Sequence, residues 1–155
     1  MAQELSIRVT PEADLIQAVS SSDVVVTCTP ARKAILRKAY IRPGTFVAAI
    51  GADSPDKQEL EASLLKGNKV VVDIFAQCAQ VGELHHALEA GIMTREDVHG
   101  ELGKVIAGKI AGRTNDEEIT IYDATGTALQ DAAGAALCYE KAMDTGKGAW
   151  VNFQR

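Results

Sequence analysis

The chain alternates short apolar runs with longer segments of mixed polarity. The apolar runs are rich in β-branched residues, which is typical of strands. The run Asp23–Cys28 ("DVVVTC") has four successive β-branched residues, as expected for a strand that is buried on both faces. Strands are predicted at residues 7–10 ("IRVT"), 23–28, 45–51, 69–74 and 119–126, with a further edge strand at 149–155 ("AWVNFQR").

The segments between these strands have helical patterns. Pro11 suits the first position of a helix that continues towards Ser22, and residues 31–44 form a basic, partly helical connection. A helix is predicted from about Lys57 to Lys66, where Gly67 provides a stop signal. Further helices are predicted as a short, glycine-broken set at 75–112 and a long, alanine-rich helix at 127–148.

Alternating strands and helices predict an α/β fold, with a parallel sheet of about four or five strands, flanking helices and right-handed crossovers. Ligands of such sheets bind beyond the carboxyl ends of the strands. Asp53 directly follows the strand "TFVAAIG" and therefore lies at this edge of the sheet. The same edge should carry Thr27-Cys28-Thr29, Asp73 and Asp123.

Length and charge restrict the class of protein. With 155 residues, 46% of them hydrophobic, the chain is long enough for one domain with a substantial core. A net charge of −5 without a long basic run argues against nucleic-acid binding. The sequence has neither an apolar stretch long enough to span a bilayer nor a signal-peptide pattern, so we expect a cytoplasmic protein without membrane contact.

Several residues that could bind metal or phosphate lack the required pattern. The three cysteines, Cys28, Cys78 and Cys138, are far apart and are interpreted as reduced thiols. His85 and His86 are adjacent on a helix and point in different directions, so no metal site is expected. The segment 103–110 ("GKVIAGKI") imitates a phosphate-binding loop but has Ile110 where Ser or Thr is required.

Four motifs in order along the chain resemble the ornithine cyclodeaminase/mu-crystallin family and its alanine dehydrogenase-like members. They are "DVVVTCTPARKAIL", "RPGTFVAAIGADSPDKQEL", "VVVDIFAQCAQVGELHHAL" and "GKIAGRTNDEEITIYDATGTALQDAAGAAL". The resemblance implies a Rossmann-like fold, NAD(P) as cofactor and a small amino or keto acid as substrate. It covers the C-terminal part of the family pattern, so residues 1–155 are interpreted as one truncated NAD(P)-binding-type domain with a C-terminal helix.

The resemblance also implies roles for individual residues. Asp53 matches the family's acid/base, and Lys57 matches a lysine that reaches the cofactor region. Ala124 takes a position where cyclodeaminases often have serine, which makes an alanine dehydrogenase-like assignment fit better. The residues implied to line the cofactor are Thr27, Thr29, Val47, Ala49, Ile50, Lys57, Ala124 and Thr125.

Each of these residues also has a structural interpretation. Asp53 could cap a helix that begins near Asp56-Lys57, and the hydroxyls of Thr27 and Thr29 could bond the local backbone. Lys57 could be an exposed lysine of the first helical turn. Glu83 is interpreted as a packing or capping residue.

The sequence contains no GxGxxG, the turn whose amides bind a dinucleotide's diphosphate. We therefore expect weak or absent NAD(P) binding and no full catalysis by this chain alone. Two alternatives are a non-catalytic binding or structural oligomer and one half of a split enzyme. The strand at 7–10 is expected to move beside 23–28, and a remaining open edge or the alanine-rich helix is expected to dock on a second copy as a homodimer.

Overall fold

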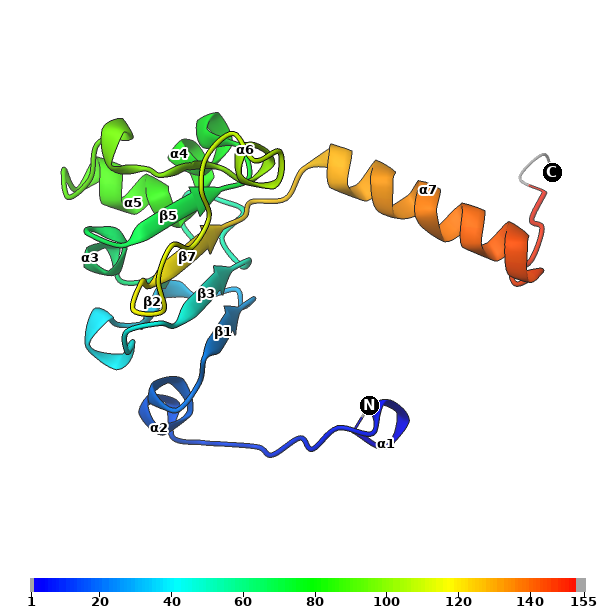
Figure 1. Ribbon diagram of the computed structural model, residues 1–155, viewed down its shortest axis with the longest axis horizontal. Helices are drawn as coiled ribbons and strands as arrows, with labels where there is room; N and C mark the ends of the chain where they lie inside the picture. Colours follow the sequence, from blue (N-terminus) through cyan, green and yellow to red (C-terminus); the bar gives the residue numbers. More distant parts are fainter. Residues whose placement is uncertain (1, 153–155) are drawn as a thin grey trace. The chain divides into compact units, whose positions relative to one another are not determined.

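The computed structural model describes residues 2–152 and divides the chain into two compact units, Met1–Thr125 and Gly126–Arg155 (Figure 1). The first unit contains a five-stranded parallel sheet in the order β1-β3-β7-β5-β6. Its strands are β1 (Val24–Thr27), β3 (Phe46–Ala49), β5 (Lys69–Val72), β6 (Gly100–Glu101) and β7 (Thr120–Asp123). The predicted α/β fold with a parallel sheet is thus confirmed.

The register of the sheet places the strand ends in one row. Thr27 lies opposite Ala49, Ala49 lies opposite Asp123, and Asp123 lies opposite Val72. The loops that leave these four positions therefore emerge at the same edge of the sheet. β7 lies between β3 and β5, so the last strand of the unit brings Asp123 to the centre of this edge.

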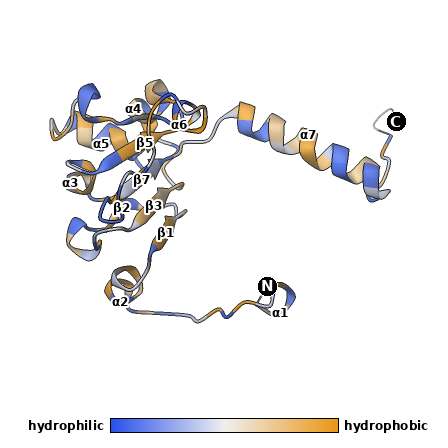
Figure 2. Cartoon of the chain, in the orientation of Figure 1, coloured by the Kyte–Doolittle hydropathy of each residue, from blue (hydrophilic) through white to orange (hydrophobic). Residues whose placement is uncertain are grey.

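One face of the sheet forms the core of the first unit. Val47, Val70 and Ile121 point into it and are almost fully buried. They pack with apolar side chains of α3 (Ala62–Leu65), α4 (Phe75–Val81) and α5 (Glu83–Glu89). The strands β1, β3 and β5 are accordingly coloured mostly as hydrophobic in Figure 2.

The other face is less covered, and here the prediction for residues 23–28 was wrong. Val25 and Thr27 of β1 face the core, but Val24 and Val26 are 58% and 60% exposed. A run of β-branched residues is compatible with a strand buried on both faces and with a strand buried on one face. These residues favour strands because of the shape of their side chains, whether or not both faces are covered. Only the neighbouring elements decide which faces are covered.

Two predicted helical segments form a second, two-stranded parallel sheet instead. It consists of β2 (Arg32–Leu36) and β4 (Gln58–Leu60). The partly helical connection predicted at 31–44 contains β2 and a short 3-10 helix, Lys38–Tyr40, and the helix predicted at 57–66 is reduced to α3. Pairing buries Leu36 and Leu60, and this tertiary contact outweighs the local helical preference.

The N-terminal predictions also need correction. Residues 7–10 form no strand and pair with no other segment among the described residues, so β1 is left at the edge of the sheet. The following helix, α2, spans Leu15–Ser20 rather than beginning at Pro11. Asp14 accepts hydrogen bonds from the amides of Ile16 and Gln17 and so caps this helix. A short helix, α1 (Ala2–Leu5), precedes these segments.

Short helical elements occur in residues 75–112 as predicted, but this segment also contains β6, an edge strand that the sequence analysis did not predict. Besides α4 and α5 they include a 3-10 turn at Arg95–Asp97 and α6 (Leu102–Ile106). Gly82 separates α4 from α5.

The second unit contains the predicted long helix as α7 (Ala128–Thr145). Thr127 caps its first turn, and Gly146 ends it in the left-handed conformation, with φ of 62°. Residues 149–152 form no strand, and the rest of the predicted edge strand, 153–155, lies outside the described residues. Within residues 2–152, no helix combines the length and hydrophobicity that crossing a membrane would require.

Replacing valine by alanine should have different effects on the two faces of the sheet. Val70→Ala should lower the free energy of unfolding by about 2 kcal/mol, because it leaves a cavity in the core. Val26→Ala, on the exposed face of β1, should change it by less than about 0.5 kcal/mol. Urea denaturation of the two variants measures both values, and equal losses would contradict the one-sided core.

Candidate functional site

Asp53 and Lys57 form an ion pair in the loop that connects β3 with β4. Lys57 Nζ lies 2.6 Å from Asp53 Oδ1. The Asp53 side chain is 59% exposed, whereas that of Lys57 is 26% exposed. The hydrogen bond from Lys57 lowers the pKa of Asp53, which keeps this carboxylate ionised at neutral pH.

This geometry removes one of the structural interpretations of Asp53. No helix begins in residues 51–60, so the expected cap near Asp56-Lys57 has no helix to bind. For the same reason Lys57 is not in the first turn of a helix, and its ammonium is paired rather than freely exposed. The pair thus presents a carboxylate, held by a lysine, at the carboxyl edge of the sheet.

The two predicted threonines lie at the end of β1 and differ in their contacts. The hydroxyl of Thr27 is buried and has no hydrogen-bond partner among the described residues. Thr29 is exposed, and its hydroxyl accepts a hydrogen bond from the Ala31 amide at 3.2 Å, which is the local backbone contact considered above. The Thr27 hydroxyl is thus enclosed by the protein, whereas the exposed Thr29 hydroxyl can still donate a hydrogen bond to another group.

The predicted residues of β3 and β7 are placed around the same edge. Val47 and Ala49 are fully buried and face the core, while Ile50, just past the strand, is 42% exposed. Ala124 is buried directly after β7, and Thr125 is half-buried. Of these, Ile50 and Thr125 offer side-chain surface at the strand ends.

Thr125 is held by Asp73, which follows β5. Its amide donates to Asp73 Oδ2 at 2.9 Å, and its hydroxyl donates to Asp73 Oδ1 at 3.2 Å. The Cys78 thiol also donates to Asp73 Oδ1, at 3.0 Å. Burial and the neighbouring carboxylates Asp123 and Asp73 raise the pKa of Cys78, so it remains a thiol, as the sequence suggested.

Asp123 connects the end of β7 to the start of α5. Its carboxylate accepts hydrogen bonds from the amides of Glu83, at 3.1 Å, and Leu84, at 2.9 Å. This approach requires glycine at position 82, because a Cβ there would lie 2.6 Å from Asp123 Oδ2. Burial raises the pKa of Asp123 to about 6, despite the two amide hydrogen bonds.

Glu83, on α5, also uses a buried carboxylate to bind two successive backbone amides. It is buried, and its carboxylate accepts hydrogen bonds from the amides of Glu59, at 2.7 Å, and Leu60, at 2.9 Å. Burial raises its pKa to about 7. The role of Glu83 is therefore not limited to packing or to capping its own helix, since its carboxylate binds the backbone of β4.

Glu59 is a site residue that the sequence analysis missed. Its buried carboxylate accepts hydrogen bonds from the Thr29 amide, at 2.5 Å, and the Gly51 amide, at 2.9 Å. These amides belong to the loops that follow β1 and β3. The polar sequence around Glu59 ("DKQELE") gave no local signal that this side chain is buried, and only its resemblance to the pair Glu83-Leu84 links the two residues.

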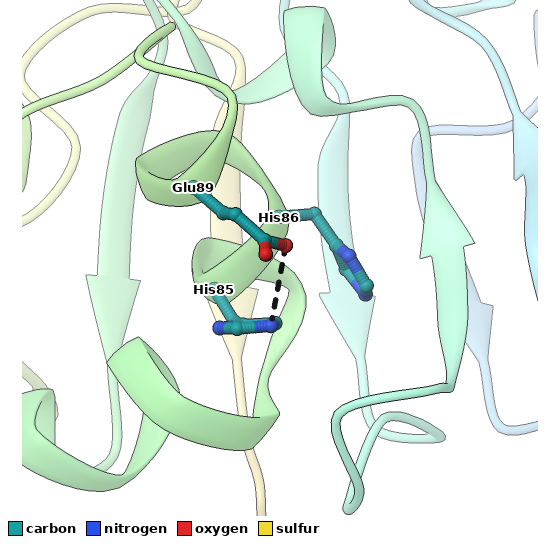
Figure 3. A group of neighbouring side chains, drawn as sticks. All are labelled: His85, His86 and Glu89. Atoms are coloured by element: carbon teal, nitrogen blue, oxygen red, sulfur yellow. Dashed lines mark ion pairs between the residues drawn. The ribbon is translucent and has the colours of Figure 1, made fainter.

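His85, His86 and Glu89 form a cluster on α5 (Figure 3). Their potential ligand atoms lie within 4.8 Å of one another, and His85 Nε2 lies 3.6 Å from Glu89 Oε2. His86 Nε2, however, is 2.7 Å from the Lys57 carbonyl oxygen. His86 thus binds the loop that carries the Asp53–Lys57 pair, and the expectation of no metal site stays a prediction.

The parallel sheet, with polar side chains gathered at its carboxyl edge, places the protein among the Rossmann-like α/β folds of dehydrogenases. The chain belongs to the ornithine cyclodeaminase/mu-crystallin family, which it matches over residues 1–146. The resemblance inferred from the four motifs is thereby confirmed.

Three relatives illustrate the match. The chain is 45% identical to the alanine dehydrogenase of Archaeoglobus fulgidus over 139 residues, which is 90% of this chain and 43% of that protein. It aligns with a structure of an archaeal alanine dehydrogenase dimer with bound NAD, with a TM-score of 0.83, 43% identity, and coverage of 98% of this chain and 47% of the other. A Thermococcus litoralis Δ1-pyrroline-2-carboxylate reductase in complex with NADH and L-proline aligns with a TM-score of 0.89 at 30% identity, covering 97% and 47% of the two chains.

The chain therefore spans less than half the length of these relatives. Family members of known structure bind NAD or NADH, which agrees with the cofactor that the resemblance implied.

The raised pKa values predict how the stability depends on pH. Glu83 and Asp123 hold a proton more tightly in the folded chain than in the unfolded chain, where their pKa values are near 4.5 and 3.8. These two groups should therefore lower the free energy of unfolding as the pH rises from about 4 to about 7, by up to about 3 kcal/mol each.

Comparison of variants isolates this effect from other titrating groups. In Glu83→Gln the stability should vary less between pH 5 and pH 8 than in the wild type, because one of the two groups no longer titrates. Glu89→Gln, at an exposed position of the same helix, is the matched control and should keep the wild-type dependence. Identical pH dependence in the wild type and Glu83→Gln would contradict the raised pKa.

Proposed function

We propose that this chain provides the nicotinamide side of an NAD(P)-dependent enzyme that oxidises, reduces or deaminates small amino or imino acids. We also propose that the chain does not perform the complete reaction alone. The exposed Asp53 carboxylate, paired with Lys57 at the carboxyl edge of a family sheet, is the main support. The relatives named alanine dehydrogenase and Δ1-pyrroline-2-carboxylate reductase support the substrate class.

The residues at this edge suit the nicotinamide half of NAD(P) better than its diphosphate. The exposed Ile50 and the ammonium of Lys57 suit the ribose and nicotinamide, and the backbone of Thr27 lies at the same strand end, although its buried hydroxyl faces the core. Ala49, Thr29, Ala124 and Thr125 belong to the strand ends and loops of the same edge, whereas Val47 lies inside β3 and is buried in the core. For the diphosphate, the 155 residues contain no GxGxxG turn, so dinucleotide binding should be weak.

The proposed chemistry uses Asp53 as an acid and base. A bound nicotinamide would take a hydride from Cα of the substrate or return one to it. Asp53, kept ionised by Lys57, accepts a proton from the substrate nitrogen and gives it back in the reverse direction. A deamination needs the same group, because the leaving amine must be protonated. The high exposure of Asp53 leaves room for a substrate to approach it.

Ligand fragments test this division of the cofactor site. Nicotinamide mononucleotide and NAD should bind the chain with similar, millimolar dissociation constants, since the diphosphate and adenosine add little. Both should shift the NMR amide signals of Thr27, Ile50 and Lys57, whereas AMP should not. Micromolar NAD binding would contradict the weak-binding proposal, and no shift with the mononucleotide would contradict the nicotinamide site.

Asp53→Asn tests whether the Asp53 carboxylate contributes to binding of the mononucleotide. It should leave the mononucleotide shifts of Thr27 and Ile50 in place, because Asp53 is proposed to act on the substrate nitrogen. Asp56→Asn is the control, since Asp56 lies in the same loop, is 64% exposed and pairs with Arg32 instead.

A second proposed role is assembly with another copy as a homodimer. β1 forms an edge of the sheet, and the apolar side chains of Val24 and Val26 are exposed along it. An edge strand of this kind invites pairing with another chain. The dimeric archaeal alanine dehydrogenase supports an association in this family.

Sedimentation equilibrium tests this second role. The wild type should dimerise, and Val26→Lys should raise the dissociation constant at least about tenfold by placing a charge on the edge strand. Ile106→Lys, at a 78% exposed position of α6, should leave the association unchanged. A monomeric wild type at all concentrations would contradict the homodimer.

A further inference from the structure

The position of the Asp53–Lys57 pair depends on a loop that has no regular secondary structure. Residues 51–57 belong to no helix or strand, and Asp53 itself is mostly exposed. Such segments are normally mobile, and within residues 51–57 only Ala52 is fully buried. A carboxylate that exchanges protons with a substrate nevertheless requires a defined position.

Two contacts hold this loop at its two ends. The Gly51 amide donates a hydrogen bond of 2.9 Å to Glu59 Oε2. At the other end, the Lys57 carbonyl oxygen lies 2.7 Å from His86 Nε2 of α5. The buried carboxylate of Glu59 also accepts from the Thr29 amide, so it connects the loop after β3 to the loop after β1.

Glu59 is itself held by a second carboxylate. The Glu59 amide donates to Glu83 Oε1, and the Glu83 amide in turn donates to Asp123 Oδ1. The three acidic residues thus form a series that runs from the end of β7, through α5 and β4, to the loops beyond β1 and β3. Because α5 carries both Glu83 and His86, it acts on Glu59 and on Lys57 together.

The close approach of backbone to carboxylate is built into the sequence at Gly51. A Cβ at this position would lie 2.5 Å from Glu59 Oε2 and 2.5 Å from the Thr29 carbonyl oxygen. Glycine therefore allows the Glu59 carboxylate to reach the loop two residues before Asp53. If Glu59 only filled space in the core, its carboxylate would not need to contact the backbone at Gly51.

We propose that Glu59 is a positioning residue for the Asp53–Lys57 pair, and that α5 fixes both Glu59 and the Lys57 carbonyl through Glu83 and His86. The functional meaning of this inference rests on the proposed function of Asp53. The mechanical link between Glu59 and Asp53 can, however, be measured without any cofactor or substrate.

The test uses Glu59→Gln, which keeps the side-chain volume but replaces one acceptor oxygen by an amide that cannot accept. Because Gln keeps one acceptor oxygen, the Thr29 amide or the Gly51 amide loses its acceptor, and hydrogen exchange of that amide should become at least about tenfold faster. The exchange of Val70 and Ile121, in the central strands, should stay unchanged. Carbon NMR titration of the Asp53 carboxyl should show its pKa returning towards the usual value, because the ion pair with Lys57 loosens.

Two further variants make the result specific. Glu61→Gln is the matched control, since Glu61 lies two residues away and binds the Lys38 amide instead, so the Asp53 titration should not change. His86→Phe removes the contact with Lys57 but leaves Glu59 intact. It should shift the Asp53 titration in the same direction without faster exchange at Thr29, and it remains informative if Glu59→Gln does not fold.

An Asp53 titration that is unchanged in both Glu59→Gln and His86→Phe would overturn the proposal. Equal acceleration of all amides in Glu59→Gln, including Val70 and Ile121, would also overturn it, because Glu59 would then act on global stability alone. If the titration shifts as expected but no nicotinamide fragment binds, the positioning of Asp53 stands and the proposed function fails.

Discussion

The arrangement of the first unit depends on buried carboxylates that accept hydrogen bonds from backbone amides. Asp123 binds two amides of α5, Glu83 binds two amides of β4, and Glu59 binds one amide in each of the loops after β1 and β3; all three carboxylates are almost completely buried. A buried carboxylate is unfavourable unless hydrogen bonds compensate for its lost hydration, so each side chain defines where its partner backbone must lie. The short, irregular segments around the sheet are thereby tied to β7 and α5.

This construction explains how an exposed pair such as Asp53–Lys57 can occupy a defined place. The loop that carries it buries Ala52, and its two ends are bound to Glu59 and His86. The core beneath supplies rigidity through α5, while the exposed side of Asp53 stays accessible. The buried residues therefore restrict the geometry, and the exposed residues are left for the chemistry.

The family relationship agrees with this division of the molecule. The relatives that bind NAD or NADH share the sheet with TM-scores of 0.83 and 0.89. This chain matches less than half of their length, and its sequence has no glycine turn for the diphosphate. The match includes the carboxyl edge with Asp53, so the proposed role of Asp53 concerns the part of the fold that this chain shares with its relatives.

The sequence by itself determined the class of fold, the strands β1, β3, β5 and β7, the long helix α7 and the place of Asp53 at a strand end. Apolar runs and glycine stops are local signals, and they survive in the structure because no tertiary contact opposes them. Tertiary structure decided that residues 32–36 and 58–60 pair as strands, that residues 7–10 do not, and that Glu59 binds the loops of the site. Such contacts join residues that are distant in sequence, and Glu83 and Asp123, for example, are 40 residues apart. No local sequence pattern contains both partners.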